Sequence, residues 1–202
     1  FDGYEILAED IYDKETPRSA QIAQRFKAAC QKRGVLPENA ATDSTGAGGP
    51  FHDVVSMEWS DRVLPVNFAG KAAGKRVSGR DRTAGCDGYA NRATEVWDGG
   101  VELLRSQQLR GVDNDVAREM VARKYETRAG GKLRVEPKVD FKSRMGKSPD
   151  LADAAFVLID LCWTRFGLLG GERFEVNAGR QDRWFQKMKS LELNTPTLIR
   201  EP

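Results

Sequence analysis

The stretch from Gly146 to Leu161, GKSPDLADAAFVLIDL, constrains the fold of this chain more than any other. From Ala154 onward it is almost entirely apolar, which predicts a helix buried among other elements rather than an amphipathic helix on the surface. Two carboxylates, Asp150 and Asp153, nevertheless lie one helical turn apart where this run begins. The sequence therefore predicts a buried helix whose first turn carries acids.

The residues around these two acids explain one of them better than the other. Ser148 suits the N-cap of the helix, Pro149 its first position, and Asp150 the first turn, where a carboxylate complements the helix dipole. Asp153 lies on the same face but is flanked by apolar residues, and carboxylates are rarely buried unless they are paired or bound to a metal. From the residues alone, a metal ligand and a structural salt bridge are equally good interpretations of Asp153.

The first part of the chain predicts an α/β fold. Residues 4–12, YEILAEDIY, are typical of a strand, and residues 17–33 are typical of a helix that packs on a sheet. Residues 40–43, AATD, are expected to form a short buried strand that ends at Asp43 and opens into a glycine loop. The order strand, helix, strand favours an α/β architecture.

Asp43 is a second candidate for the chemistry. In open α/β sheets ligands bind beyond the carboxyl ends of the strands, so Asp43 would lie at that edge, where small residues leave room for a bulky substrate. The alternative is a turn residue that accepts hydrogen bonds from the backbone of the following STG, which is the commoner role for a single Asp. Carboxylates that converge on one point form a hard-oxygen site suited to Mg²⁺ or Mn²⁺, and two such ions about 3.5–4 Å apart can hydrolyse a phosphodiester.

The organisation of the whole chain is one domain with an appendage. We expect the domain over residues 1–166 and a tail over residues 167–202, with one short amphipathic helix near Trp184. The dipeptide Asp2-Gly3 is typical of a hairpin turn, so a further strand is expected upstream of the sequence given. The intervening elements are expected to be helices over 51–59, 89–104 and 115–124, strands over 62–70 and 130–138, and a loop over 71–87.

Composition and motifs argue against several classes of function. Lys and Arg number 32 against 30 Asp and Glu, so the net charge of +2 does not itself indicate a polyanion partner, and any basic surface must be local. Three dispersed cysteines without a CxxC pair argue against a disulfide framework or a zinc site and favour a reducing compartment such as the cytoplasm. No stretch is long and apolar enough for a membrane span, no phosphate-binding glycine loop occurs, and His52, the single histidine, has no catalytic motif around it.

Four motifs together resemble one protein family. The segments ATDSTGAGG, VNFAGKA, YANRATEVW and KLRVEPKVDFKSRMGKSPDLADA occur in the order and at about the spacing found in the C-terminal nuclease domain of tailed-phage large terminase subunits, over about residues 5–165. The resemblance implies a ribonuclease H-like fold, with helices around a central mixed sheet, and an endonuclease that cuts concatemeric phage DNA during packaging. It also implies two divalent ions, Mg²⁺ or Mn²⁺, and a place in the cytoplasm of the infected host. The implied partners are double-stranded DNA, the portal protein, the small terminase subunit and the ATPase domain of the same full-length protein.

The resemblance also assigns roles to the acids. Asp43 resembles the acid of the family's second strand, Asp153 the acid of the closing helix, and Asp150 a polar position one turn earlier near the metals. These three residues are therefore the expected catalytic residues and metal ligands. The family's first metal-binding Asp lies on an opening strand that is expected upstream of the sequence given or is missing from it. Glu9 and Asp10 are poor substitutes because they fall on the next strand.

Basic residues near these motifs are candidates for contacts with DNA phosphates. For any single residue a solvated surface charge is the better interpretation, but the group that leads directly to the acids is the more persuasive as a group, because its position in the sequence forces it close to Asp150. Nothing in the sequence is suited to read base edges, so little sequence specificity is expected. The leading group comprises Lys138, Lys142, Arg144 and Lys147, and a second group in the glycine-rich loop comprises Lys71, Lys75, Arg76, Arg80 and Arg82.

Two other functions remain open from the sequence. The chain is also consistent with a non-catalytic docking module that keeps the fold and contacts portal, small terminase or DNA through its tail or its basic loop. Another ribonuclease H-like nuclease, such as a Holliday-junction resolvase, is a further alternative. The segments DSTGAGG and VNFAGKA favour a terminase over a resolvase.

Overall fold

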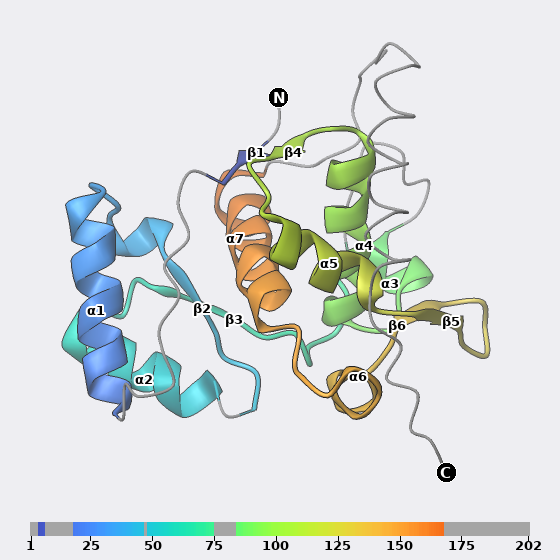
Figure 1. Ribbon diagram of the computed structural model, residues 1–202, viewed down its shortest axis with the longest axis horizontal. Coiled ribbons are helices and arrows are strands. Elements are labelled where there is room, and N and C mark those ends of the chain that lie inside the picture. The colour runs from blue at the N-terminus through green and yellow to red at the C-terminus, as the bar shows by residue number, and fades with distance from the viewer. Residues whose placement is uncertain (1–3, 7–17, 47, 75–83, 168–202) are drawn as a thin grey trace.

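The structure of the protein, a computed structural model, describes residues 4–6, 18–46, 48–74 and 84–167 (Figure 1). Several sequence predictions lie outside these residues, and so does most of the strand expected over 4–12. These predictions concern the turn at Asp2-Gly3, the acids Glu9 and Asp10, the basic residues Lys75, Arg76, Arg80 and Arg82, and the tail from residue 168 onward.

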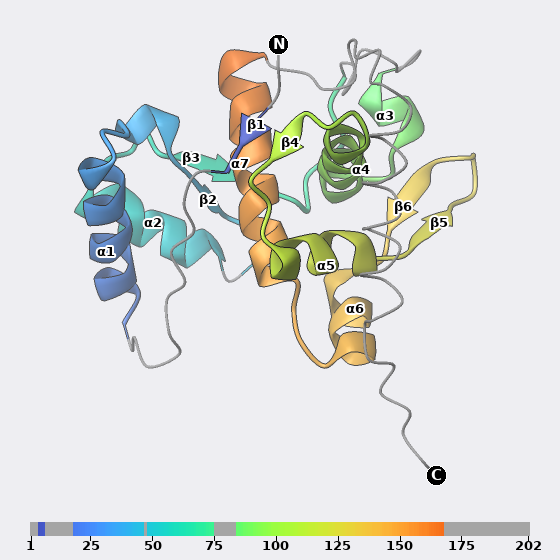
Figure 2. The same ribbon diagram turned by 45° about the horizontal axis from the view of Figure 1, so that its top comes forward.

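Helix α7, Asp150–Phe166, is the central element of the described chain. Figures 1 and 2 show it between a group of elements from the first part of the chain and a group from the second part. It contacts strands β2 (Ala41–Asp43) and β3 (Leu64–Val66) on one side. On the other side it contacts helices α4 (Arg92–Arg105) and α5 (Asn114–Ala122). Its buried residues include Ala152, Phe156, Ile159 and Trp163. The predicted buried helix is confirmed, and its apolar residues let it pack on both sides.

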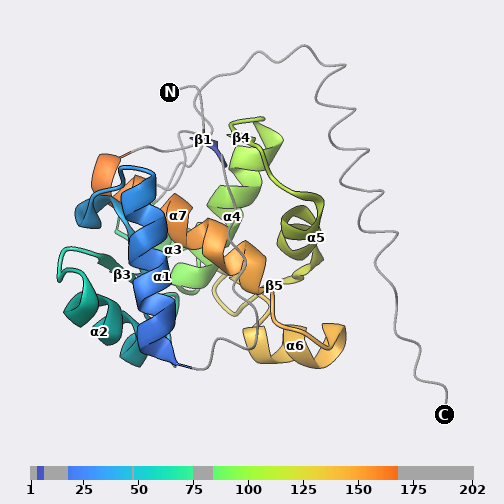
Figure 3. The same cartoon turned by 60° about the vertical axis from the view of Figure 1, so that its left-hand side comes forward.

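The first group combines two helices with a short parallel strand pair. Strands β2 (Ala41–Asp43) and β3 (Leu64–Val66) pair in parallel, with Asp43 opposite Val66. Helices α1 (Ser19–Lys32) and α2 (Gly48–Glu58) pack against each other beside this pair, as Figure 3 shows. A 3₁₀ helix, Pro37–Asn39, leads into β2. The small core of this group contains Ala23, Ala40, Val55 and Val63.

The second group packs on the opposite side of α7. Helices α4 (Arg92–Arg105) and α5 (Asn114–Ala122) supply most of its core, and the rings of Trp97 and Phe156 lie 4.2 Å apart between their centroids. Strand β1 pairs in parallel with β4, and β5 pairs antiparallel with β6. The smaller elements are β1 (Tyr4–Glu5), α3 (Gly85–Gly88), β4 (Leu109–Arg110), β5 (Tyr125–Thr127), β6 (Leu133–Val135) and α6 (Lys138–Met145).

The α/β fold class is confirmed, but the strands are arranged differently from the expectation. Within the described ranges they form three two-stranded pairs rather than one central mixed sheet. The sequence did not predict β5 or α6, because β5 is exposed throughout and Phe141 is the one residue of α6 that is fully buried. None of the helices in these ranges is long and apolar enough to cross a membrane.

The start of α7 differs from the prediction by one position. The helix begins at Asp150, and Pro149 occupies the N-cap position without a side-chain cap, so the assignment of Ser148 as N-cap is wrong. Glu119 of α5 performs this role instead, because its Oε2 accepts from two N–H groups of the first turn of α7, at 2.9 and 3.1 Å. A cap supplied by another helix leaves no trace in the local sequence.

Gly100 of α4 provides the space for the ring of Phe156. A Cβ at position 100 would lie 1.9 Å from Cε1 of that ring, which is fully buried. Because overpacking a close-packed core forces side chains and backbone to shift, we expect Gly100→Ala to lower the free energy of unfolding by about 1–3 kcal/mol. Urea-induced unfolding measures the change. Gly88→Ala is the control, since a Cβ there would meet open space, and equal stability of the two variants would contradict the packing described here.

Candidate active site

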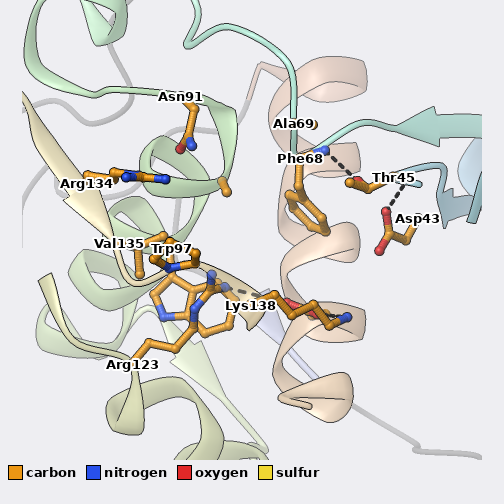
Figure 4. A pocket seen from close by; sticks show the side chains of 13 residues that line it. Asp43, Thr45, Phe68, Ala69, Asn91, Trp97, Arg123, Arg134, Val135 and Lys138 are labelled. Carbon is orange, nitrogen blue, oxygen red and sulfur yellow. Dashed lines mark hydrogen bonds and ion pairs between the residues drawn. The ribbon is translucent and has the colours of Figure 1, made fainter. Parts of the chain in front are cut away.

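A pocket of about 220 Å³ lies beside α7 and is lined by both groups of elements (Figure 4). Asp43, Thr45 and Phe68 line it from the side of β2 and β3, and Asp153 lines it from α7. Two of the three predicted acids, Asp43 and Asp153, are thus brought to one pocket. The remaining lining residues are Ala69, Asn91, Ala93, Trp97, Arg123, Arg134, Val135, Pro137 and Lys138.

Asp43 ends strand β2, as predicted, and the glycine loop that follows is shaped around it. Its Oδ1 accepts from the N–H of Thr45 at 2.7 Å, and the hydroxyl of Thr45 accepts from the N–H of Phe68 at 2.9 Å. The carboxylate therefore makes the turn contact considered from the sequence and also lines the pocket. One glycine of this loop, Gly48, has a steric reason, since a Cβ at position 48 would lie 2.3 Å from the carbonyl oxygen of Asp43.

Asp153 is a buried carboxylate with two cations beside it. The residue is 8% exposed. The ammonium Nζ of Lys138 lies 2.6 Å from its Oδ2, and Nη1 of Arg123 lies 3.9 Å from its Oδ1. Burial raises the pKa of Asp153 above its usual value although both cations oppose the shift, and the negative charge of Asp43 raises it further. The salt bridge considered from the sequence is present, at a place where a second carboxylate is close enough to interact.

Lys138 connects the two acids of α7. Its Nζ lies 3.3 Å from Oδ1 of Asp150 as well as 2.6 Å from Oδ2 of Asp153. Burial lowers the pKa of Lys138, but the hydrogen bond and charge of Asp153, together with Asp150, outweigh it and hold the pKa above its usual value. In this structure the ammonium of Lys138 thus neutralises the acids, and its predicted contact with a DNA phosphate stays a prediction.

Asp150 has a different environment from the other two acids. Its side chain is 76% exposed, and it does not line the pocket. No group of three His, Cys, Asp or Glu residues suited to hold a metal occurs within the described ranges. The carboxylate oxygens of Asp43 and Asp153 are hard donors that suit Mg²⁺ or Mn²⁺, whereas two ions need more donors than these residues provide. The additional acid expected on an upstream strand stays a prediction.

The other basic residues predicted to contact DNA are, where the structure describes them, all exposed, and two of them pair with carboxylates of the domain. Lys147 pairs with Glu119 at 3.0 Å, next to the carboxylate oxygen that caps α7. Arg144 donates from Nε and Nη2 to the carboxylate of Glu136, at 3.0 and 2.6 Å, and from Nη2 to the carbonyl oxygen of Ala122, at 2.7 Å. These ion pairs help to hold the domain together, and the predicted contacts of both residues with DNA stay predictions. Lys142 and Lys71 are exposed, so they keep the predicted role as candidates.

No pattern in the sequence indicates Arg123 as a site residue. It follows the last residue of α5, is 7% exposed, and lines the pocket. Burial lowers the pKa of its guanidinium, and the charge of Asp153 opposes this shift. An arginine at the end of an amphipathic helix normally indicates a solvated charge, so only the tertiary structure reveals it. Asn91, the N-cap of α4, and Arg134 in β6 also line the pocket and were not predicted from the sequence.

The ion pair of Glu136 and Arg144 predicts a dependence of stability on pH. The hydrogen bonds from Arg144 hold the pKa of Glu136 below its usual 4.5, against the opposing effect of burial. The folded-state pKa is thus below the unfolded one, so the stabilisation is complete above about pH 4.5 and is lost as the pH falls through the folded pKa. We expect Glu136→Gln to cost roughly 1 kcal/mol at neutral pH and less in acid. Urea unfolding of both proteins across this range measures the difference, and a cost that is independent of pH would contradict the ion pair.

Comparison with solved structures identifies the fold of the chain. No protein-family profile and no curated protein sequence matches the chain. Among solved structures, the nuclease domain of the large terminase subunit gp2 of bacterial virus Sf6 matches with a TM-score of 0.55 and 16% identity, over 69% of this chain and 71% of that one. A lysine-to-alanine variant of that domain with manganese and beta-thujaplicinol matches with the same TM-score and identity, over 76% and 74%. The chain therefore shares the fold of this terminase nuclease domain.

Proposed function

We propose that this chain is a metal-dependent endonuclease that cuts concatemeric viral DNA during genome packaging, by two-metal hydrolysis of phosphodiesters. The observation that carries the proposal is the Asp153 carboxylate, which is 8% exposed and lines the same pocket as Asp43. A carboxylate in such a place is costly unless a positive charge accompanies it. Lys138 supplies that charge in this structure, and a divalent ion is proposed to supply it during cutting.

Lys138 is well suited to move away from Asp153 when a metal ion binds. Its side chain is 46% exposed and reaches Asp153 from α6, whereas Asp153 is fixed on the central helix. A lysine carries its charge on a flexible four-carbon stem, so it can move aside without a change in the backbone. The displaced ammonium would stay near the pocket, where a phosphate of the substrate replaces the carboxylates as its partner.

The chemistry follows from the donors that the pocket offers. A divalent metal, when bound, activates water and stabilises the charge that develops on the phosphodiester oxygens. Asp43 and Asp153 would hold it, with the upstream acid as a further donor. Thr45 fixes the Asp43 side chain through its N–H, and exposed Lys142 is placed to contact the DNA backbone without reading bases.

The similarity of the fold to terminase nuclease domains supports proposals for the metal, the substrate, the partners and the location of this activity. The structural matches include terminase nuclease domains with manganese and with calcium, which supports a divalent ion here. By the same likeness, the proposed substrate is double-stranded DNA, and the proposed partners are an ATPase domain of the same protein, a portal protein and a small terminase subunit. The proposed location is the cytoplasm of an infected host cell.

Cutting of supercoiled plasmid with Mn²⁺ tests the proposal. We expect Asp43→Asn and Asp153→Asn each to reduce the rate of DNA cutting by at least roughly 10–100-fold. The loss of a residue that only orients a metal ligand already has an effect of about this size, and these acids are proposed to be ligands themselves. Asp61→Asn is the matched control, because Asp61 is an exposed acid in the turn before β3, outside the pocket lining. The free energy of unfolding of each variant shows whether the fold is intact.

Two results would contradict the proposed function. Persistent cutting by both pocket variants would show that these acids are not the site. A folded wild-type chain that never cuts, even with an upstream strand added, would favour the non-catalytic docking module instead.

The proposed displacement of Lys138 makes a separate prediction. Lys138→Ala removes the ammonium that lies 2.6 Å from Oδ2 of Asp153, so we expect it to increase the affinity for Mn²⁺ in the absence of DNA, by about tenfold or 1.4 kcal/mol. Isothermal titration calorimetry above neutral pH measures this affinity. Lys142→Ala, an exposed lysine on the same helix, should leave it unchanged. Weaker binding by Lys138→Ala would contradict the idea that lysine and metal compete for Asp153.

A further inference from the structure

Arg123 lines the pocket and is held mainly by partners other than Asp43 and Asp153. Its guanidinium carbon lies 4.2 Å from the centre of the Trp97 ring, in a cation–π arrangement. Its Nε donates to the carbonyl oxygen of Glu136 at 3.0 Å, and Nη2 donates to the same oxygen. A residue that is 7% exposed and fixed in this way stays in place whether or not Lys138 is present.

The two oxygens of Asp153 face different cations. Oδ2 lies 2.6 Å from Nζ of Lys138, whereas Oδ1 lies 3.9 Å from Nη1 of Arg123. The longer distance is that of a charge pair and not of a hydrogen bond, so Arg123 attracts Oδ1 without occupying it closely. The flexible cation therefore covers one oxygen, and the fixed cation orients the other.

We propose that Arg123 is a positioning residue that attracts Oδ1 of Asp153 and so leaves Oδ2 as the oxygen that would hold a divalent ion. This inference rests on the proposed function and adds to it the way in which the acid is oriented. Ligands of metal sites are commonly oriented by a partner that holds their other polar atom. A planar guanidinium suits this position better than an ammonium, because it can stack on Trp97 and donate to the Glu136 carbonyl at the same time.

The contact with Glu136 extends the role of Arg123 to the segment that carries Lys138. The carbonyl that accepts from Arg123 lies two residues before Lys138, and the side chain of the same Glu136 is held by Arg144. Arg123 thus connects the end of α5, the turn that leads into α6, and the acid on α7. Its loss is expected to change both the orientation of Asp153 and the position of its lysine partner.

Affinity for Mn²⁺, with no DNA and no turnover, tests the inference. Arg123→Met keeps an unbranched apolar stem about as far as the Nε position but removes the guanidinium, and with it the charge, the donors and the contact with the Trp97 ring. We expect it to weaken Mn²⁺ binding by about 10–100-fold in calorimetry, with a changed electron paramagnetic resonance spectrum of the bound ion. Arg123→Lys, which keeps the charge, should recover part of the affinity. Arg118→Met is the control, since Arg118 is an exposed arginine of α5 that pairs with Asp115.

The outcomes separate this inference from the proposed function. Wild-type protein that binds Mn²⁺ while folded Arg123→Met and Arg123→Lys bind it equally well would overturn the inference and leave the function standing. Wild-type protein that binds no Mn²⁺ would overturn both. If Arg123→Met does not fold, Arg123→Lys decides alone, because an affinity equal to that of wild type would overturn the inference and a loss of several-fold would support it.

Discussion

The burial of the Asp153 carboxylate is the constraint on which the rest of the site depends. Asp153 lies on the helix that forms the centre of the domain, so its charge cannot be moved to solvent without moving the core. Positive charges must therefore come to it, and Lys138 and Arg123 do so from two other elements. A buried charge that loses a partner destabilises a protein by several kcal/mol. The pairing of Lys138 with Asp153 therefore also holds the segment before α7 in place.

The segment from β6 to α7 is organised around two carboxylates that have no direct part in the proposed chemistry. Glu136 receives Arg144, and Glu119 receives Lys147 and the first N–H groups of α7. These contacts fix both ends of α6, from which Lys138 reaches the pocket. Lys138, Arg144 and Lys147, which the sequence offers as candidates for DNA contacts, thus pair with carboxylates in this structure, and all three remain exposed.

The sequence predicted the elements that carry the acids better than it predicted their surroundings. The strand that ends at Asp43 and the helix that carries Asp153 follow from local patterns, an apolar run before a glycine loop and a long apolar helix. The capping of that helix by Glu119 and the burial of Arg123 arise from residues far apart in the sequence, so no local pattern contains them. Helix α6 was missed because Phe141 is its one fully buried residue, which gives too weak an apolar periodicity.

Anomalous diffraction from crystals soaked in Mn²⁺ shows whether Asp43 and Asp153 together hold a divalent ion. We expect a manganese peak bound to both carboxylates in the pocket, with the ammonium of Lys138 moved away from Oδ2 of Asp153. A manganese peak bound to other residues, with Lys138 still paired to Asp153, would contradict it.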